Sequence, residues 1–179
     1  MIAIPKQAIA DELVSQLETT VWRPNRLWLV AMIVLSVGVN GALSRVARLG
    51  LADWYQALAK PSFVPPDWAF AVAWTSLYAL MAVSLWFYWR ATADRPAAWR
   101  GGTTLFAVQY LTCSAWPFMF FGLQSTLLGF VGTLVLVPMI IATIILFGRY
   151  SRPAALALVP YLLWSTLAIA MSYQVWQLN

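Results

Sequence analysis

The chain has 179 residues, of which 62% are hydrophobic and only 9% are charged, and its mean hydropathy is +0.74. So little polar surface excludes an ordinary soluble domain and indicates an integral membrane protein. The net charge of +5 does not indicate a nucleic-acid partner, because the Lys and Arg residues lie at the ends of apolar segments, where they set membrane orientation.

The Asp, Glu, Lys and Arg residues all lie outside the long apolar runs, and the chain contains no His. Proton relays and ion paths need charged residues within the membrane, and His is the commonest metal ligand. We therefore predict no metal site and no required cofactor. The single cysteine, Cys113, lies in an apolar run, where a small buried side chain is the default interpretation.

Residues 1–26 form an N-terminal extension that is polar enough to lie outside the bilayer. Ala8, Ile9, Leu13, Leu17 and Val21 recur at roughly helical spacing with acidic residues between them, which predicts a short surface helix. The acidic residues argue against a signal peptide. We treat the extension as a candidate contact for a protein partner.

Residues 27–179 are predicted to form one all-α membrane domain of five transmembrane helices. A hydrocarbon core of about 30 Å requires about 20 helical residues, and the expected spans are 27–43, 68–89, 101–122, 126–147 and 154–178. The third and fourth spans must be antiparallel neighbours because only residues 122–125 join them. Pro117, Pro138 and Pro160 lie inside spans and favour kinks there.

The loop between the first two spans, residues 45–66, is expected to contain a short amphipathic piece over 49–58. Pro61, Pro65 and Pro66 fix the backbone and make the loop stiff. Asp67 is expected to cap the second span. We interpret residues 54–66 as a rigid lid over a pocket within the membrane.

Orientation follows from the basic residues on alternate sides of the five spans. Eight fall on one side and Arg45, Arg48 and Lys60 on the other; the eight are Lys6, Arg23, Arg26, Arg90, Arg95, Arg100, Arg149 and Arg152. This predicts a cytoplasmic N-terminus, with the lid and the C-terminus outside. Helical spans without a signal peptide favour a bacterial inner membrane.

Large side chains repeat at helical spacing on three spans, which places each set on one helix face. The sets are Trp74, Tyr78 and Met81; Gln109, Cys113, Trp116 and Phe120; and Trp164, Ala168, Met171 and Val175. Such faces serve either as helix packing or as the wall of a pocket. Trp74 and Trp164 lie well inside their spans, where an indole N–H needs a partner, whereas Gln109 is equally consistent with helix-to-helix contact.

The sequence resembles the TspO/translocator protein family of tryptophan-rich sensory proteins over residues from about 27 onward. The matching residues are Trp54-Tyr55, Leu58, Lys60-Pro61, Phe63, Pro65-Pro66, Trp68, Phe70, Ala73-Trp74-Thr75, Leu77-Tyr78, Leu80-Met81, Gln109, Trp116-Pro117, Phe120-Phe121-Gly122, Pro160-Tyr161, Trp164, Ala168 and Leu178-Asn179.

The resemblance implies a five-helix bundle, often a homodimer, whose cavity opens toward the first loop and binds tetrapyrroles such as protoporphyrin IX. It places Trp74, Trp164 and Ala168 in that cavity. Together with the helix faces and the loop, the candidate ligand-binding residues are Trp54, Pro65, Trp68, Trp74, Tyr78, Gln109, Cys113, Trp116, Phe120, Trp164 and Ala168.

The sequence departs from the family pattern at Cys113, where many members have Asn, and at Met171-Ser172, where many have Leu-Asn. No Lys or Arg follows Tyr173, so the animal-type sterol motif is not carried over.

Three functions stay open. The first is a porphyrin-binding sensor, scavenger or transporter, and the second is a light-dependent porphyrin-degrading enzyme that uses Trp74 and Trp164. The third is a structural subunit of a larger membrane complex.

Overall fold

The computed structural model describes residues 24–51 and 53–179, and its regular structure there is entirely helical. Within these described residues, five helices are long and apolar enough to cross a membrane. They are α2 (Arg26–Leu51), α4 (Asp67–Ala91), α5 (Pro96–Pro117), which continues into the π-helical segment η1 (Phe118–Gly122), α6 (Thr126–Gly148) and α7 (Arg152–Leu178). The predicted all-α, five-span fold is confirmed, and the chain is a multi-pass membrane protein. The surface helix predicted from Ala8 to Val21 lies outside the described residues.

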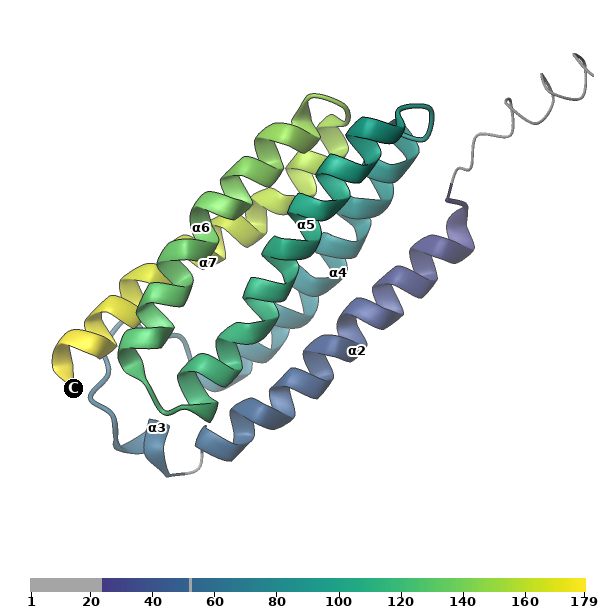
Figure 1. Cartoon of the computed structure of the whole chain (residues 1–179). Coiled ribbons are helices and arrows are strands. Elements are labelled where there is room, and N and C mark those ends of the chain that lie inside the picture. Colours follow the sequence, from purple (N-terminus) through teal and green to yellow (C-terminus); the bar gives the residue numbers. More distant parts are fainter. Residues whose placement is uncertain (1–23, 52) are drawn as a thin grey trace, which may run out of the picture.

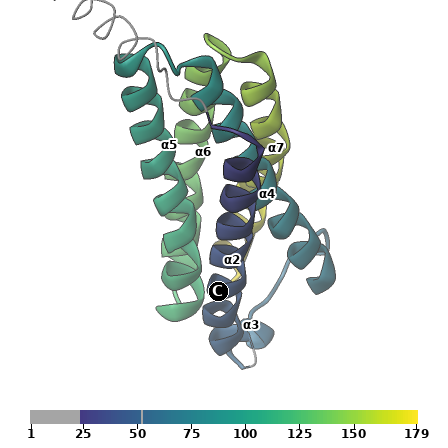
Figure 2. The ribbon, with the colours of Figure 1, turned by 90° about the vertical axis from the view of Figure 1, so that its right-hand side faces the viewer.

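The helices follow one another around the bundle in an order that differs from their order in the chain. Helix α2 packs along α4, α4 along α7, α7 along α6 and α6 along α5, while η1 and α5 contact α2 (Figures 1 and 2). The predicted pairing of the third and fourth spans is confirmed by the contact between α5 and α6. A short helix, α3 (Trp54–Ala57), lies at the end of the bundle where α7 ends.

Three helix N-termini are capped by side chains that accept backbone N–H groups, as expected for Asn and Ser at these positions. The Oδ1 atom of Asn25 accepts from Leu27 N at 3.0 Å. Ser125 Oγ accepts from Leu128 N at 3.2 Å, and Ser151 Oγ accepts from the third residue of α7. These caps determine where α2, α6 and α7 begin.

Several predicted boundaries were wrong. Helix α2 continues to Leu51 instead of ending near residue 43, because helix-forming residues continue beyond the apolar run. Helix α5 begins at Pro96 instead of residue 101, since Pro is well suited to a first helical turn. Asp67 is the first residue of α4, not its cap, and its carboxylate makes no capping bond; Pro66 occupies the cap position.

A kink was predicted at Pro117, and the structure has a π-helical turn directly after this residue. The N–H groups of Leu123 and Ser125 donate to Phe118 O (2.8 Å) and Phe120 O (3.1 Å), five residues earlier in each case. A π turn contains more residues than an α turn and often occurs at functional sites. Gln124, with φ of 50°, then reverses the chain into α6.

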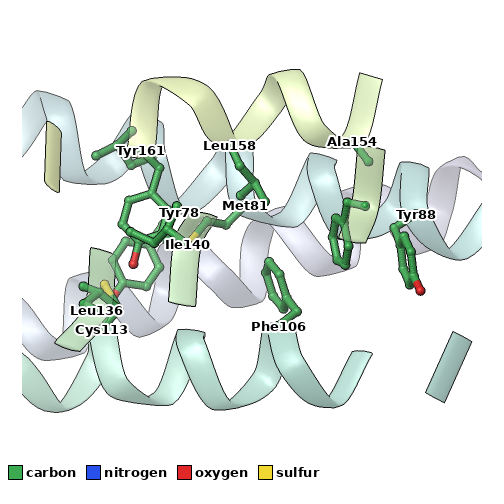
Figure 3. Close-up of a cluster of buried hydrophobic side chains, with 12 residues drawn as sticks. Tyr78, Met81, Tyr88, Phe106, Cys113, Leu136, Ile140, Ala154, Leu158 and Tyr161 are labelled. Carbon is green, nitrogen blue, oxygen red and sulfur yellow. The ribbon is translucent and has the colours of Figure 1, made fainter. Parts of the chain in front are cut away.

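The core lies between α4, α5, α6 and α7 and is strongly aromatic. The Tyr88 ring stacks on Phe147 with centroids 3.9 Å apart, and Ser84 Oγ donates to Ala154 O at 2.7 Å, which joins α4 to the start of α7. Figure 3 shows Tyr88 at one end of this buried cluster and Tyr78 and Cys113 at the other. The end of the cluster that contains Tyr78 and Cys113 borders a cavity.

Candidate functional site

A cavity of about 440 Å³ occupies the α3 end of the bundle. The alternating direction of the helices brings the second half of α2, the first half of α4, the end of α5 with η1, the first half of α6 and the second half of α7 to this end. The lining residues are Asn40, Leu43, Ser44, Ala47, Arg48, Tyr55, Gln56, Val64, Asp67, Phe70, Ala71, Trp74, Thr75, Tyr78, Cys113, Trp116, Pro117, Phe120, Phe121, Thr133, Leu136, Trp164, Ser165, Ala168, Met171, Ser172 and Val175.

One wall of the cavity is formed by aromatic rings from α4 and α7. The Phe70 ring meets Trp164 edge to face with centroids 5.6 Å apart. The Trp74 ring lies 6.2 Å from Tyr78 and 6.5 Å from Tyr161. Edge-to-face rings of this kind present flat apolar surfaces and hold one another in place. The wall is therefore suited to a flat apolar ligand.

A second part of the lining comes from the rings of Tyr55, Trp116, Phe120 and Phe121, and we call these four rings together with Trp54, which packs on Phe120 outside the lining, the aromatic clamp. Trp116 stacks on Phe120 with centroids 4.9 Å apart and planes 11° from parallel. The ring of Phe120 also meets Trp54 at 5.2 Å and Phe121 at 4.9 Å, both near edge to face. The clamp therefore joins α3, which lies over the cavity, to α5 and η1 beneath it.

The tryptophans that line the cavity differ in their hydrogen bonding. The indole N–H of Trp116 donates to Gly129 O at 2.8 Å and to Thr133 Oγ1 at 2.9 Å, which joins α5 to α6. Within the described part of the chain, the indole N–H groups of Trp74 and Trp164 have no hydrogen-bond partner, although both residues line the cavity. Trp116 thus acts in packing, whereas Trp74 and Trp164 keep a donor available.

The deep end of the cavity carries small polar groups. The Tyr78 hydroxyl lies 3.4 Å from Ser114 Oγ and 4.0 Å from Cys113 Sγ. Figure 3 shows Tyr78 and Cys113 beside Leu136, and Tyr161 nearby. On α7, Ser165 is 1% exposed, and its hydroxyl has no partner among the described residues. These groups can make a few polar contacts but carry no charge.

Among the described residues, the charged ones that line the cavity are Arg48 and Asp67, from the ends of α2 and α4 that face α3. Asn40 Nδ2 donates to Thr75 Oγ1 at 3.3 Å and joins the same two helices deeper in the bundle. The lining therefore changes from charged at the mouth to aromatic and weakly polar inside. Such a gradient suits a ligand with an apolar body and a polar edge.

Tyr55 on α3 connects the clamp with the mouth. Its ring lies 5.6 Å from Phe121, and Lys60 Nζ lies 4.5 Å from the ring centroid. Burial, together with the nearby Asp67 carboxylate, raises the pKa of the Tyr55 phenol above its usual value. The phenol is therefore neutral over the physiological range.

The structure brings most of the predicted site residues to the cavity and leaves four out. Residues on its lining are Trp74, Tyr78, Cys113, Trp116, Phe120, Trp164 and Ala168. Trp54 touches Phe120 from the clamp, while Trp68 is 70% exposed. Pro65 is not among the lining residues. Gln109 is fully buried, with Nε2 3.9 Å from Met81 Sδ, which favours helix contact for this side chain.

The lining also contains residues that the sequence prediction did not include. Phe70 precedes Trp74 by four residues, so extending the α4 face by one turn identifies it. Ser165 lies three residues before Ala168 and Asn40 four residues before Ser44, so both share a helix face with other lining residues, but Ala168 and Ser44 are small side chains and not large aromatic ones. Arg48 was assigned to a loop, and only the extension of α2 to Leu51 brings it to the mouth.

Comparison with known proteins gives one consistent result. The sequence profile of the TspO/MBR family matches residues 29–177. The tryptophan-rich protein TspO of Chlorobaculum tepidum is 37% identical over 153 residues, which is 86% of this chain and 96% of the relative. Protein CrtK of Rhodobacter capsulatus is 35% identical over 153 residues, covering 86% and 94% of the two chains. The translocator protein of Ovis aries is 34% identical over 126 residues, covering 70% and 75%.

Proposed function

The chain belongs to the TspO/MBR family of membrane proteins, and from the chemistry of its cavity we propose that it binds a planar hydrophobic ligand of the tetrapyrrole class, such as protoporphyrin IX. The bound pigment is sensed, scavenged or passed on. The observation that carries this proposal is the pair of cavity tryptophans, Trp74 and Trp164, whose indole N–H groups have no hydrogen-bond partner among the residues that the structure describes. An apolar pocket that fixes a ligand needs a few such polar groups.

The dimensions and polarity of the cavity support the proposal. A volume of about 440 Å³ lies within the range of roughly 300–1,000 Å³ typical of small-molecule sites. The aromatic wall offers flat surfaces to a macrocycle, and Arg48 at the mouth offers a cation to carboxylates on the edge of the ligand.

The test is a titration of protoporphyrin IX against the purified protein in detergent, followed by the change in porphyrin absorption. We expect saturable binding that weakens about tenfold or more in Trp74→Ala and in Trp164→Ala, because each change removes an aromatic contact and a donor. Trp28→Ala is the matched control, since Trp28 lies near the opposite end of α2. Absence of saturable binding, or equal affinity in all three variants, would contradict the proposal.

A second candidate is light-dependent oxidation of the bound porphyrin with dioxygen as the oxidant. The proximity of Trp74 to Tyr78 and Tyr161 favours it, because neighbouring phenols are able to re-reduce an oxidised indole. The expected sign is a product with altered absorption that forms only in light and in air, faster than from porphyrin in empty micelles. Loss of that acceleration in Trp74→Phe, with binding retained, would support catalysis. Bleaching no faster than in empty micelles would leave binding as the function.

The orientation and the assembly of the protein form a separate proposal. We propose a bacterial inner-membrane protein with the mouth of the cavity outside, because the basic residues concentrate at the other end of the bundle. Reporter fusions placed after Arg95 and after Lys60 are expected to report opposite sides of the membrane. The homodimer implied by the resemblance stays a prediction, which mass measurement of the detergent complex tests.

A further inference from the structure

The side chain of Asn179, directly after α7, binds the backbone of a residue in the first loop, 120 positions earlier in the chain. Its Oδ1 atom accepts from Ala59 N at 3.0 Å, and its Nδ2 atom donates to Ala59 O at 3.1 Å. The same Nδ2 group donates to Val175 O at 2.7 Å. One amide thus satisfies both backbone groups of Ala59, in the way that a neighbouring strand does, and is itself held by α7.

Ala59 belongs to the segment that covers the cavity. It follows α3, from which Tyr55 and Gln56 line the cavity, and it precedes Val64, which also lines it. Prolines at 61, 65 and 66 restrict the backbone of this segment. Because the segment is stiff, we expect residues 58–66 to be held in place when the backbone of Ala59 is held.

The lid, defined here as residues 54–66, therefore has two attachments on different sides of the cavity. On one side the aromatic clamp holds Trp54 and Tyr55 on η1, with centroid distances of 5.2 Å from Trp54 to Phe120 and 5.6 Å from Tyr55 to Phe121. On the other side the Asn179 amide holds Ala59 on α7. Figure 1 shows the loop after α3 passing the end of α7.

The two attachments differ in how easily they separate. The clamp consists of several packed rings, whereas the attachment to α7 consists of hydrogen bonds between exposed groups, for which water substitutes at small net cost. The α7 side is therefore the side that opens first. Val175, whose carbonyl anchors Asn179, is itself a lining residue, so this opening occurs directly at the cavity wall.

We propose that Asn179 is a positioning residue that latches the lid to α7 and so sets the rate at which molecules reach the cavity. An amide suits this role because it presents a donor and an acceptor side by side to one peptide unit. The effect on ligand kinetics rests on the proposed function, but the latch itself does not, and its principal test uses no ligand.

Cys113 provides that test, since it is the only cysteine of the chain and lines the cavity with 3% of its surface exposed. The experiment measures the rate at which N-ethylmaleimide, an uncharged thiol reagent, modifies Cys113 in the full chain in detergent. Asn179→Leu keeps the size of the side chain and removes its hydrogen bonds. Gln177→Leu is the matched control on the same turn, because Gln177 is exposed and makes no described hydrogen bond. Cys113→Ser identifies any modification elsewhere.

Loss of two hydrogen bonds to the lid is expected to raise the labelling rate roughly tenfold in Asn179→Leu, with the control unchanged. Hydrogen exchange at the Ala59 amide should accelerate in the same variant because its acceptor, Asn179 Oδ1, is removed, and this ties any gain in Cys113 labelling to the loss of that bond. Unchanged labelling, or faster labelling with unchanged Ala59 exchange, would overturn the latch. Equal circular dichroism of the two variants confirms that both are folded.

Protoporphyrin IX kinetics provide the second measurement. A latch that controls access alters the association and dissociation rates by the same factor and leaves Kd nearly constant, whereas a merely structural role raises Kd through dissociation alone. If no variant, wild type included, binds the porphyrin, the proposed function fails while the labelling result still decides the latch.

Discussion

Gly129 on α6 is the position where the aromatic clamp leaves no room for a side chain. A Cβ atom built there would overlap the ring of Phe120. That ring has little freedom to retreat, because Trp116 stacks on one face and Phe121 meets it at 4.9 Å. We therefore predict that Gly129→Ala displaces Phe120 from the cavity wall and weakens both folding and ligand binding.

The magnitude is a balance between two effects. Overpacking a well-filled core costs about 1–3 kcal/mol, while Ala gains about 0.5–1 kcal/mol over Gly in a helix interior. We expect a net loss of about 1–2 kcal/mol in the free energy of unfolding, measured by SDS titration in mixed micelles with far-UV circular dichroism. Because Phe120 lines the cavity, the Kd for protoporphyrin IX should rise several-fold.

Two other glycines give graded controls. At Gly132 a Cβ would lie 3.2 Å from Met119 Cε, which is able to move, and 3.3 Å from Trp116 Cδ1, so Gly132→Ala should be less destabilising than Gly129→Ala. Gly101 has no atom within 4 Å of that position, so Gly101→Ala should be stabilising by up to about 1 kcal/mol. If Gly129→Ala were as stable as Gly101→Ala and bound porphyrin equally well, the close approach at Phe120 would not exist and the reasoning would be wrong.

Three further predictions concern the cavity, the core and the lid. Trp68→Ala should leave the Kd for protoporphyrin IX within about twofold of wild type, because the Trp68 ring is 70% exposed and lies outside the lining, so it makes no aromatic contact with a ligand in the cavity. A larger change in Kd would show that Trp68 belongs to the binding site. Ser84→Ala should lower the free energy of unfolding by about 0.5–1.5 kcal/mol in the SDS titration, since it removes the bond to Ala154 O. Tyr55 should titrate above its usual range, because burial and then Asp67 raise its pKa. Its contribution to stability is therefore present below the unfolded-state pKa of about 10 and is lost as pH rises through the higher folded-state pKa. The measurement is absorbance at 295 nm, wild type minus Tyr55→Phe, and a midpoint at or below 10 would contradict it.

The sequence was sufficient to predict the five membrane-spanning helices, because the bilayer itself requires helices of a minimum length and hydrophobicity. Apolar runs of fixed minimum length must be helices whose backbone groups bond internally, so the five spans were predictable from hydropathy alone. Boundaries beyond the hydrocarbon region carry no such signal. Helix α2 extends to Leu51 through residues that are merely compatible with a helix, and the π turn after Pro117 depends on how Phe118–Gly122 packs against α2 and α6.

The site was predictable only where it follows helical periodicity. Trp74 and Tyr78 lie on one face of α4, and Trp164 and Ala168 lie on one face of α7, so spacing was enough to place each pair on the lining. Gln109 shares the face of Cys113 by the same rule but is buried against Met81, because which part of a face meets the cavity depends on the neighbouring helix. The bond between Asn179 and Ala59 has no sequence signal at all, since it joins residues 120 positions apart.

The polar groups on the described lining of the cavity differ between its mouth and its deep end. The carboxylate and the guanidinium on the lining, from Asp67 and Arg48, lie at the mouth, while the described residues of the deep end offer hydroxyl, thiol and indole groups. Groups of this kind orient a ligand but provide no acid or base near neutral pH. Any reaction deep in the cavity would therefore depend on chemistry that a bound ligand brings, and the proposed latch would set how fast such a ligand enters and leaves.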